Sequence, residues 1–236
     1  MKNLDVIKAI NPNCVNSDGS IKSFKEQLLE LEWGLFDTSY HLVLSKDSSA
    51  LRQAGLNDYP ITVIPETIIK MKQKHDLEFS VIADIPSVIQ EHNALLMQSY
   101  TRDNSLVMYL DIDNNEGVPL FATFHLEEET QSVNINRLTS MYDRKNIEFT
   151  IAKTMQEGLD IYTNENTEKW LKTHGVQFPS DLTTLLNCSR KNDNLDILFN
   201  KNENLSPSDI FSNAKDRANE LNKSKQSIST SKQKHL

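Results

Sequence analysis

The sequence predicts an α+β protein in which helices precede a small antiparallel β-meander, with helical extensions at both ends. Two patterns carry this prediction. Apolar residues recur at helical spacing before residue 93. Two segments rich in apolar and aromatic residues follow at 105–110 and 118–126, and then an alternating one at 132–142. Because helical and strand patterns occupy separate parts of the chain, they are typical of an α+β fold.

Length and composition favour one folded domain with extensions. A chain of 236 residues is long enough to bury one core, and its ends are rich in Asn, Lys and Ser. We therefore expect a helical N-terminal extension at 1–58, a central α+β domain at 59–175, a helical appendage at 176–222 and a disordered tail at 223–236.

Helices are predicted wherever apolar residues recur every three or four positions. Ser20 is expected to open a helix in which Phe24, Leu28 and Leu31 face the core, and Pro65 suits the first turn of another. The other predicted helices lie at 4–10, 48–54, 84–92, 167–174, 181–186 and 208–221.

Strands are predicted at 105–110, 118–126 and 132–142, where the sequence around Asn115–Gly117 favours a chain reversal. These three strands form the meander. A short apolar segment at 41–44 is expected to be a further strand, and residues 147–151 a fourth strand of the meander.

The charge and the motifs exclude several classes of protein. A net charge of -8 and a pI near 5.3 argue against a protein that coats nucleic acid or an anionic membrane. Neither a signal peptide nor an apolar segment of membrane-spanning length is evident, so no membrane partner is expected. Cys14 and Cys188 lack metal-ligand spacing and indicate a reducing compartment. No metal, cofactor or nucleotide-binding loop is predicted.

The segment 66–75 carries most of the functional signal. At about 100° per residue, Ile68, Met71 and His75 fall on one stripe of the helix, so the imidazole continues the buried face. Lys72 is expected to flank that stripe, while Lys70 and Lys74 turn away. Such a histidine either titrates in a cleft or forms a hydrogen bond at the margin of the core, and position alone favours the second interpretation.

A second set of candidates lies at the end of the third strand: Arg137, Thr139, Ser140, Tyr142, Asp143, Arg144 and Lys145. Alternation predicts that Ser140 and Tyr142 share a face with Leu138, and that a bulge or strand end aims hydroxyl and guanidinium groups into one opening. His125 on the neighbouring strand is expected to face the same way as Thr123. The ordinary polarity of a strand end is the alternative explanation.

The order of these short motifs resembles the C-terminal domain of phage MuF-type proteins and of large phage polyvalent proteins. The resemblance spans roughly residues 42–171. It rests on Ile-Thr-Val-Ile-Pro-Glu-Thr, Lys74-His75, Ile-Pro-Ser-Val-Ile, Gly-Val-Pro, Val-Asn-Ile-Asn, Ser140-Met-Tyr142, Gly158 and Trp170.

The resemblance implies a function. The family is similar in layout to the barnase, EndoU, colicin and RelE group of nucleases, which implies a toxin-type, metal-independent ribonuclease. Its Lys-His pair corresponds to Lys74 and His75, and its Ser-x-Tyr element to Ser140 and Tyr142. The implied partners are RNA, with tRNA as one candidate, and a cognate immunity or virion protein. The implied location is the cytoplasm of a bacterial host after delivery by a phage.

Roles in this chemistry follow from side-chain type. His75 suits the general acid or base, Ser140 and Tyr142 suit contacts with phosphate, and Arg144 suits the charge of the transition state. Substrate-binding roles are expected for Lys72, Lys74, Arg137, Thr139 and His125. The acidic balance favours the alternative, a catalytically inactive phage-associated protein that binds a virion or host protein. A small-molecule hydrolase or transferase has no supporting motif.

Overall fold

The computed structural model describes residues 3–176 and confirms the α+β class. The chain divides into two compact units. Unit 1 comprises Met1–Arg144 and Tyr162–Thr167, and unit 2 comprises Lys145–Ile161 and the chain from Glu168 onward. The appendage helices predicted at 181–186 and 208–221, and the tail predicted at 223–236, lie outside the described residues.

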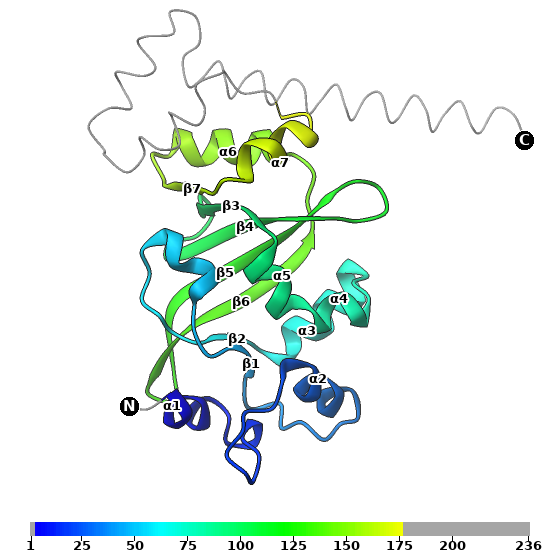
Figure 1. Cartoon of the computed structure of the whole chain (residues 1–236), viewed down its shortest axis with the longest axis vertical. Helices are drawn as coiled ribbons and strands as arrows, with labels where there is room; N and C mark the ends of the chain where they lie inside the picture. Colours follow the sequence, from blue (N-terminus) through cyan, green and yellow to red (C-terminus); the bar gives the residue numbers. More distant parts are fainter. Residues whose placement is uncertain (1–2, 177–236) are drawn as a thin grey trace, which may run out of the picture. The chain divides into compact units, whose positions relative to one another are not determined.

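The sheet has seven strands in the order β1-β2-β6-β5-β4-β3-β7 (Figure 1). Their bounds are β1 Leu42–Ser45, β2 Ile61–Val63, β3 Asn93–Gln98, β4 Ser105–Asp113, β5 Pro119–Thr130, β6 Val133–Asp143 and β7 Ile161–Thr163. The β4-β5-β6 meander is antiparallel, as predicted, whereas β2 pairs with β6 in parallel. The sheet is therefore larger and more mixed than the predicted meander.

The helices of unit 1 precede the meander. They are α1 Asn3–Ile10, the 3-10 turn η1 Pro12–Cys14, α2 Phe24–Glu32, the 3-10 helix η2 Ser49–Ala54, α3 Pro65–His75, α4 Phe79–Ala83 and α5 Ile85–Glu91. The prediction that Ser20 opens the second helix is wrong. Ser23 caps α2 instead, because its hydroxyl accepts from the Glu26 N–H while the Glu26 carboxylate accepts from the Ser23 N–H.

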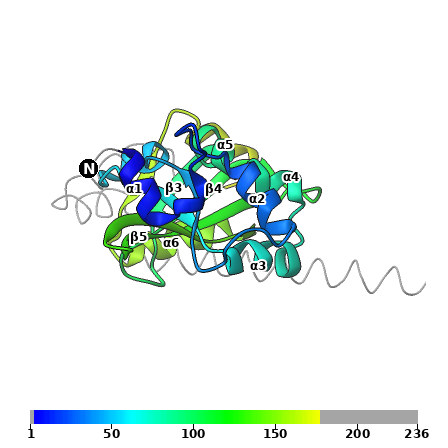
Figure 2. The ribbon, with the colours of Figure 1, turned by 90° about the horizontal axis from the view of Figure 1, so that it is seen from below.

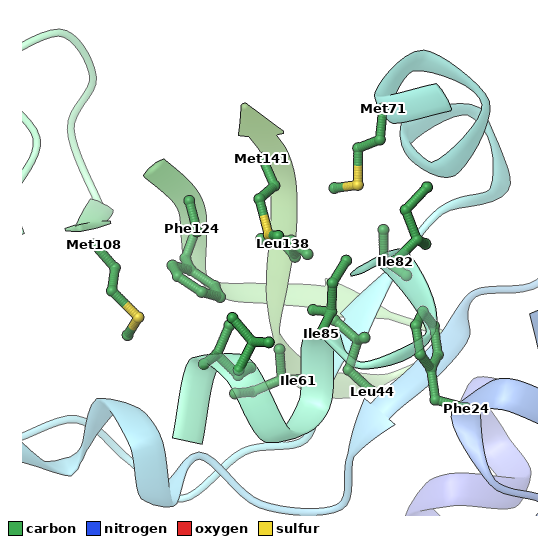
Figure 3. Packing of buried hydrophobic residues seen from close by; sticks show 14 of the residues in the cluster. Phe24, Leu44, Ile61, Met71, Ile82, Ile85, Met108, Phe124, Leu138 and Met141 are labelled. Carbon is green, nitrogen blue, oxygen red and sulfur yellow. The ribbon is translucent and has the colours of Figure 1, made fainter. Parts of the chain in front are cut away.

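One face of the sheet carries the main core of unit 1. Alternate side chains of β4, β5 and β6, such as Met108, Phe124 and Leu138, pack with apolar residues of the helices, such as Met71 and Ile85 (Figure 3). Helices α2, α3 and α4 contact one another and lie together, apart from α1 (Figure 2). These helices close this face of the sheet.

On the opposite face, α1 covers β1 and the start of β6, while Val107, Tyr109 and Phe121 are buried further along β4 and β5. Ile7 and Ile10 of α1 pack with Val43 of β1 and with Val133 and Ile135 at the start of β6. Further along β6, the residues that follow on this face are polar. The sheet therefore has a packed face and a partly polar face, and the candidate site lies on the second.

Unit 2 contains α6 Ile147–Gln156 and most of α7 Thr167–Thr173. The fourth strand predicted at 147–151 is wrong, since this segment is the start of α6. Buried Ile147, Thr150, Ile151 and Thr154 follow the i, i+3, i+4, i+7 spacing of a helix, which prevails over the strand preference of β-branched residues. The predicted helix near 167–174 is confirmed.

Candidate active site on the polar face of the sheet

Helix α3 brings His75 to the edge of the sheet. Strand β2 pairs with β6 only as far as Leu138, and α3 contacts β6. Ile68 and Met71 of α3 are buried in the core, as the helical stripe predicts. The helix ends at His75, and Asp76 follows in the left-handed conformation with φ of 51°. The imidazole therefore lies where the helix and the end of β6 meet.

The His75 ring stacks on the ring of Tyr142, with centroids 5.1 Å apart and an interplanar angle of 26°. Its Nε2 is buried and has no hydrogen-bond partner among the described residues. Burial lowers the pKa of His75, and the charges of Lys70 and Lys74 lower it further, while the Asp143 carboxylate acts in the opposite direction. The imidazole is therefore mainly neutral at pH 7.

Arg144 lies on the other side of Tyr142. Its Nη1 donates to the Tyr142 hydroxyl at 3.3 Å, and its Nη2 donates to the Tyr100 hydroxyl at 3.1 Å. The guanidinium carbon lies 4.4 Å from the ring centroid of Phe121, which is the cross-strand partner of Tyr142. Burial alone would lower the pKa of Arg144, but the neighbouring tyrosines, Tyr109 first, raise it. The guanidinium keeps its charge.

A β-bulge in β6 sets the direction of Ser140 and Thr139. Thr123 pairs with Ser140 and Phe124 with Leu138, so Thr139 is the extra residue. A bulge is present here, as predicted, but the prediction that Ser140 and Tyr142 share a face with Leu138 is wrong. The bulge resets the alternation, so that Leu138 joins the core while Ser140, two residues before Tyr142, lies on the polar face. The Thr139 hydroxyl donates to the Thr123 carbonyl at 3.1 Å.

His125 and Arg137 lie further along this face as a cross-strand pair. Both contact Glu128, whose carboxylate lies 2.9 Å from His125 Nδ1 and 2.5 Å from Arg137 Nε. His125 lies four positions along β5 from Phe121, the partner of Tyr142, which corresponds to about 13 Å along the strand. His125 and Arg137 therefore do not share one phosphate-sized site with His75.

The lysines of α3 differ from expectation in their surroundings. Lys72, predicted to flank the stripe of His75, forms an ion pair with Glu32 at the end of α2. Lys70 and Lys74, predicted to turn away, are the exposed cations whose charges act on His75. Of the two lysines proposed to bind substrate, Lys74 is therefore the one that influences the imidazole.

Three residues of the site were not predicted, namely Tyr100, Phe121 and Glu128, whereas Asp143 was among the candidates at the end of the third strand. Asp143 Oδ1 is buried without a hydrogen-bond partner among the described residues, while its Oδ2 accepts from Asn114 Nδ2 at 2.6 Å. The place of Asp143 next to the Ser-x-Tyr element was a signal for it in the sequence. No local sequence pattern marks Tyr100, Phe121 or Glu128, because these residues reach the site through contacts between segments that are distant in the sequence.

Within residues 3–176, no group of three or more His, Cys, Asp or Glu side chains is arranged to bind a metal ion. None of the described helices is long and apolar enough to cross a membrane.

Comparison with known proteins gives one match. Residues 67–170 match the family described as the phage MuF C-terminal domain. Neither curated proteins nor solved structures gave a match to the chain. The matched segment runs from α3 to α7 and includes His75, Tyr142 and Arg144. The phage MuF part of the predicted resemblance is confirmed, whereas the likeness to nucleases stays a prediction. The central part of this chain is similar to the C-terminal domain of phage MuF proteins.

Proposed function

We propose that this phage-type domain is a metal-independent endoribonuclease of the toxin kind, with its reaction centre at His75, Tyr142 and Arg144. The observation that carries the proposal is the continuous contact from the His75 ring to the Tyr142 ring and from the Tyr142 hydroxyl to Arg144. These residues come from a helix end and a strand end that lie far apart in the sequence.

The proposed reaction starts at the ribose 2′-hydroxyl. A base removes its proton, the 2′ oxygen attacks the adjacent phosphorus, and the 5′ oxygen leaves with a proton from an acid. His75 suits the base because its lowered pKa keeps the imidazole neutral. Since Nε2 is buried, Nδ1 is the nitrogen that meets the substrate.

Asp143 supports this assignment. Its Oδ1 and the Nε2 of His75 are buried polar atoms without partners among the described residues, and the charge of Asp143 favours the protonated imidazole. A rotation that joined them would place an Nε2–H against the carboxylate and leave the lone pair of Nδ1 for the substrate. Hydrogen bonds between a base and its orienting group are often longer in the absence of substrate.

The developing charge on phosphorus requires cations and hydrogen-bond donors. Arg144 provides a fixed guanidinium, because Tyr100 and Tyr142 accept its hydrogen bonds and Phe121 supports its face. Lys74 adds an exposed cation beside His75. Local positive charge of this kind is compatible with a net charge of -8, since it is concentrated at one place.

The test is cleavage of RNA by the purified full-length chain in the presence of a chelator. We expect the wild-type protein to cut single-stranded RNA and leave 2′,3′-cyclic phosphate ends. His75→Ala should reduce kcat/KM by about 10²–10⁴, the usual contribution of a general acid or base. His92→Ala is the matched control, because His92 is an exposed histidine at the end of another helix, α5.

Three results would contradict the proposal: intact RNA at high protein concentration, full activity of His75→Ala, or activity that appears only with added divalent cations. Arg144→Lys adds a check on the charge, since lysine retains the cation but cannot bond to both tyrosines in the same way. A loss in kcat larger than any change in KM is expected for this variant.

A second candidate function is protein binding without catalysis. Among the described residues, the most exposed large apolar side chains are Trp33 at 68%, Leu35 at 73% and Ile69 at 44%. The ion pair between Lys72 and Glu32 joins the ends of α2 and α3, so these side chains lie on neighbouring elements. Such a patch suits a virion or host protein. Intact RNA, together with binding to one virion protein that Trp33→Ser abolishes, would favour this candidate.

A further inference from the structure

A second cluster of functional side chains lies on the polar face, about 13 Å along β5 from the pair of Phe121 and Tyr142. His125 Nδ1 is 2.9 Å from Glu128 Oε1. Arg137 donates from Nε to Glu128 Oε2 at 2.5 Å and from Nη2 to Glu128 Oε1 at 2.9 Å. The Arg137 guanidinium thus donates two hydrogen bonds to the Glu128 carboxylate, and this carboxylate contacts the His125 imidazole.

The backbone is distorted to form this cluster. The register of β5 and β6 shifts between His125 and Glu128, and Glu127 adopts a left-handed conformation with φ of 52°. This bulge places Glu128 opposite Ile135, on the face of Arg137, whereas regular alternation would turn Glu128 away from His125. The bulge therefore creates the contact between carboxylate and imidazole.

Hydrogen bonds with two asparagines hold the left-handed Glu127 in place. Asn136, which is fully buried, accepts from the Glu127 N–H at 2.9 Å and donates to the Ser48 hydroxyl at 2.8 Å. Asn57 donates to the Glu127 carboxylate at 2.6 Å. Left-handed non-glycine residues cost free energy and persist only where the surroundings enforce them, and they concentrate at functional sites.

The cluster determines which nitrogen of His125 carries the proton. Arg137 lowers the pKa of Glu128 to about 2, with a further contribution from His125, so the carboxylate is ionised and only accepts hydrogen bonds. Nδ1 must therefore be the protonated nitrogen. Arg137 Nη2 lies 3.2 Å from Nδ1, but a protonated Nδ1 has no lone pair with which to accept a hydrogen bond from it. The lone pair of the imidazole remains on Nε2 in a fixed direction.

The charge of the cluster indicates the ligand. Arg137 and Glu128 neutralise each other, so the cluster offers no net positive charge for a phosphate group. What it offers is an acceptor of fixed direction at Nε2, on the same face as the hydroxyls of Thr123 and Thr139, which lie 2.8 Å apart. A sugar hydroxyl fits such a surface better than an anion.

We propose that His125 accepts a hydrogen bond from a ribose 2′-hydroxyl of RNA, one or more nucleotides away from the reaction centre, and so distinguishes RNA from DNA. Glu128 and Arg137 are positioning residues that fix the tautomer. That the ligand is RNA rests on the proposed function. The fixed direction of the acceptor at His125 Nε2 rests only on the hydrogen bonds of the cluster. A 2′-hydroxyl is the group that lets a protein separate the two nucleic acids at one site.

The first test measures binding of RNA and DNA oligonucleotides of one sequence to the full-length chain in the His75→Ala background, where RNA is expected to remain whole. Adding His125→Phe or Glu128→Ala should weaken RNA binding about 3- to 10-fold, the value of one hydrogen bond, and leave DNA binding unchanged. Glu129→Ala is the matched control, because Glu129 is the exposed neighbour.

The second test measures the tautomer of His125 from the nitrogen chemical shifts of its ring. We expect Nδ1–H in the wild-type protein and a shift toward Nε2–H in Glu128→Ala. Because this measurement uses only the wild type and Glu128→Ala, it tests the inference even if His125→Phe does not fold. An Nε2–H form in the wild type, equal losses for RNA and DNA, no change in either affinity, or no binding of nucleic acid would each overturn the inference.

The two proposals fail separately. Cleavage of RNA by the wild type with an unchanged preference in Glu128→Ala would refute only the role of His125. Preferential binding of RNA that depends on Glu128, without any cleavage, would refute the ribonuclease and leave the acceptor in place.

Discussion

Replacement of Glu128 by Gln tests the electrostatics of the polar face through stability. The pKa of Glu128 falls from 4.5 to about 2, first because Arg137 donates to the carboxylate. Linkage converts this difference into roughly 3 kcal/mol at most. Since the side chain is 30% exposed, solvent screening reduces the effect to about 1–2 kcal/mol.

The sign of the pH dependence follows from the direction of the change in pKa. The folded state favours the ionised carboxylate, so the stabilisation is complete above pH 4.5 and disappears as the pH falls from 4.5 toward 2. We therefore expect Glu128→Gln to lower the free energy of unfolding by about 1–2 kcal/mol at pH 7 and to match the wild type near pH 2.

The assay is urea denaturation at several pH values, followed by NMR resonances of unit 1 so that unfolding of unit 2 is not counted. Glu129→Gln is the control, because it removes one carboxylate of the same strand that is exposed. A difference between wild type and Glu128→Gln that stays constant with pH, or grows in acid, would refute the electrostatic account.

Two further predictions concern the surroundings of His75 and the support of the bulge. Lys74→Gln should raise the pKa of His75, because it removes a positive charge that disfavours the imidazolium, and an NMR titration that shows no rise would contradict this explanation. Asn136→Ala should lower the free energy of unfolding by about 2–3 kcal/mol, since it leaves the Glu127 N–H and the Ser48 hydroxyl without their buried partner. Asn134→Ala, at an exposed position of β6, should cost less than about 0.5 kcal/mol in the same urea assay, and equal losses would argue against a special role for the buried amide.

The sequence predicted those elements whose periodicity is strong and local. The stripe of Ile68 and Met71 gave α3 and the place of His75 at its end, and the apolar and aromatic segments with the alternation in 132–142 gave the meander. Strand β3 was missed because Ala94–Met97 consists of Ala, Leu and Met, which favour helices, and its continuous burial leaves no alternation to oppose that preference. Strand β2 was missed because three residues are too few for a pattern.

The contacts of the candidate site depend on pairings between distant segments. Tyr142 meets His75 because β2 pairs in parallel with the first part of β6, and α3, which follows β2 directly, then runs beside the rest of β6. Arg144 meets Tyr100 through a loop that follows another strand, β3. Neither contact produces a periodic pattern in the sequence, so residue spacing alone could not predict that Tyr142 meets His75 or that Arg144 meets Tyr100.

The two bulges explain how one sheet has both a packed and a polar face. In a regular ladder Leu138 and Ser140 would share a face, which would either expose the leucine or bury the serine. The extra residue Thr139 removes this conflict, and the left-handed Glu127 does the same for Glu128. Since each bulge carries a cost in backbone hydrogen bonding or conformation, both are better explained by the side chains they direct than by packing. Polar groups gathered on one face at the expense of regular pairing are what a binding surface requires, and this is the strongest argument that this face of the sheet is the functional one.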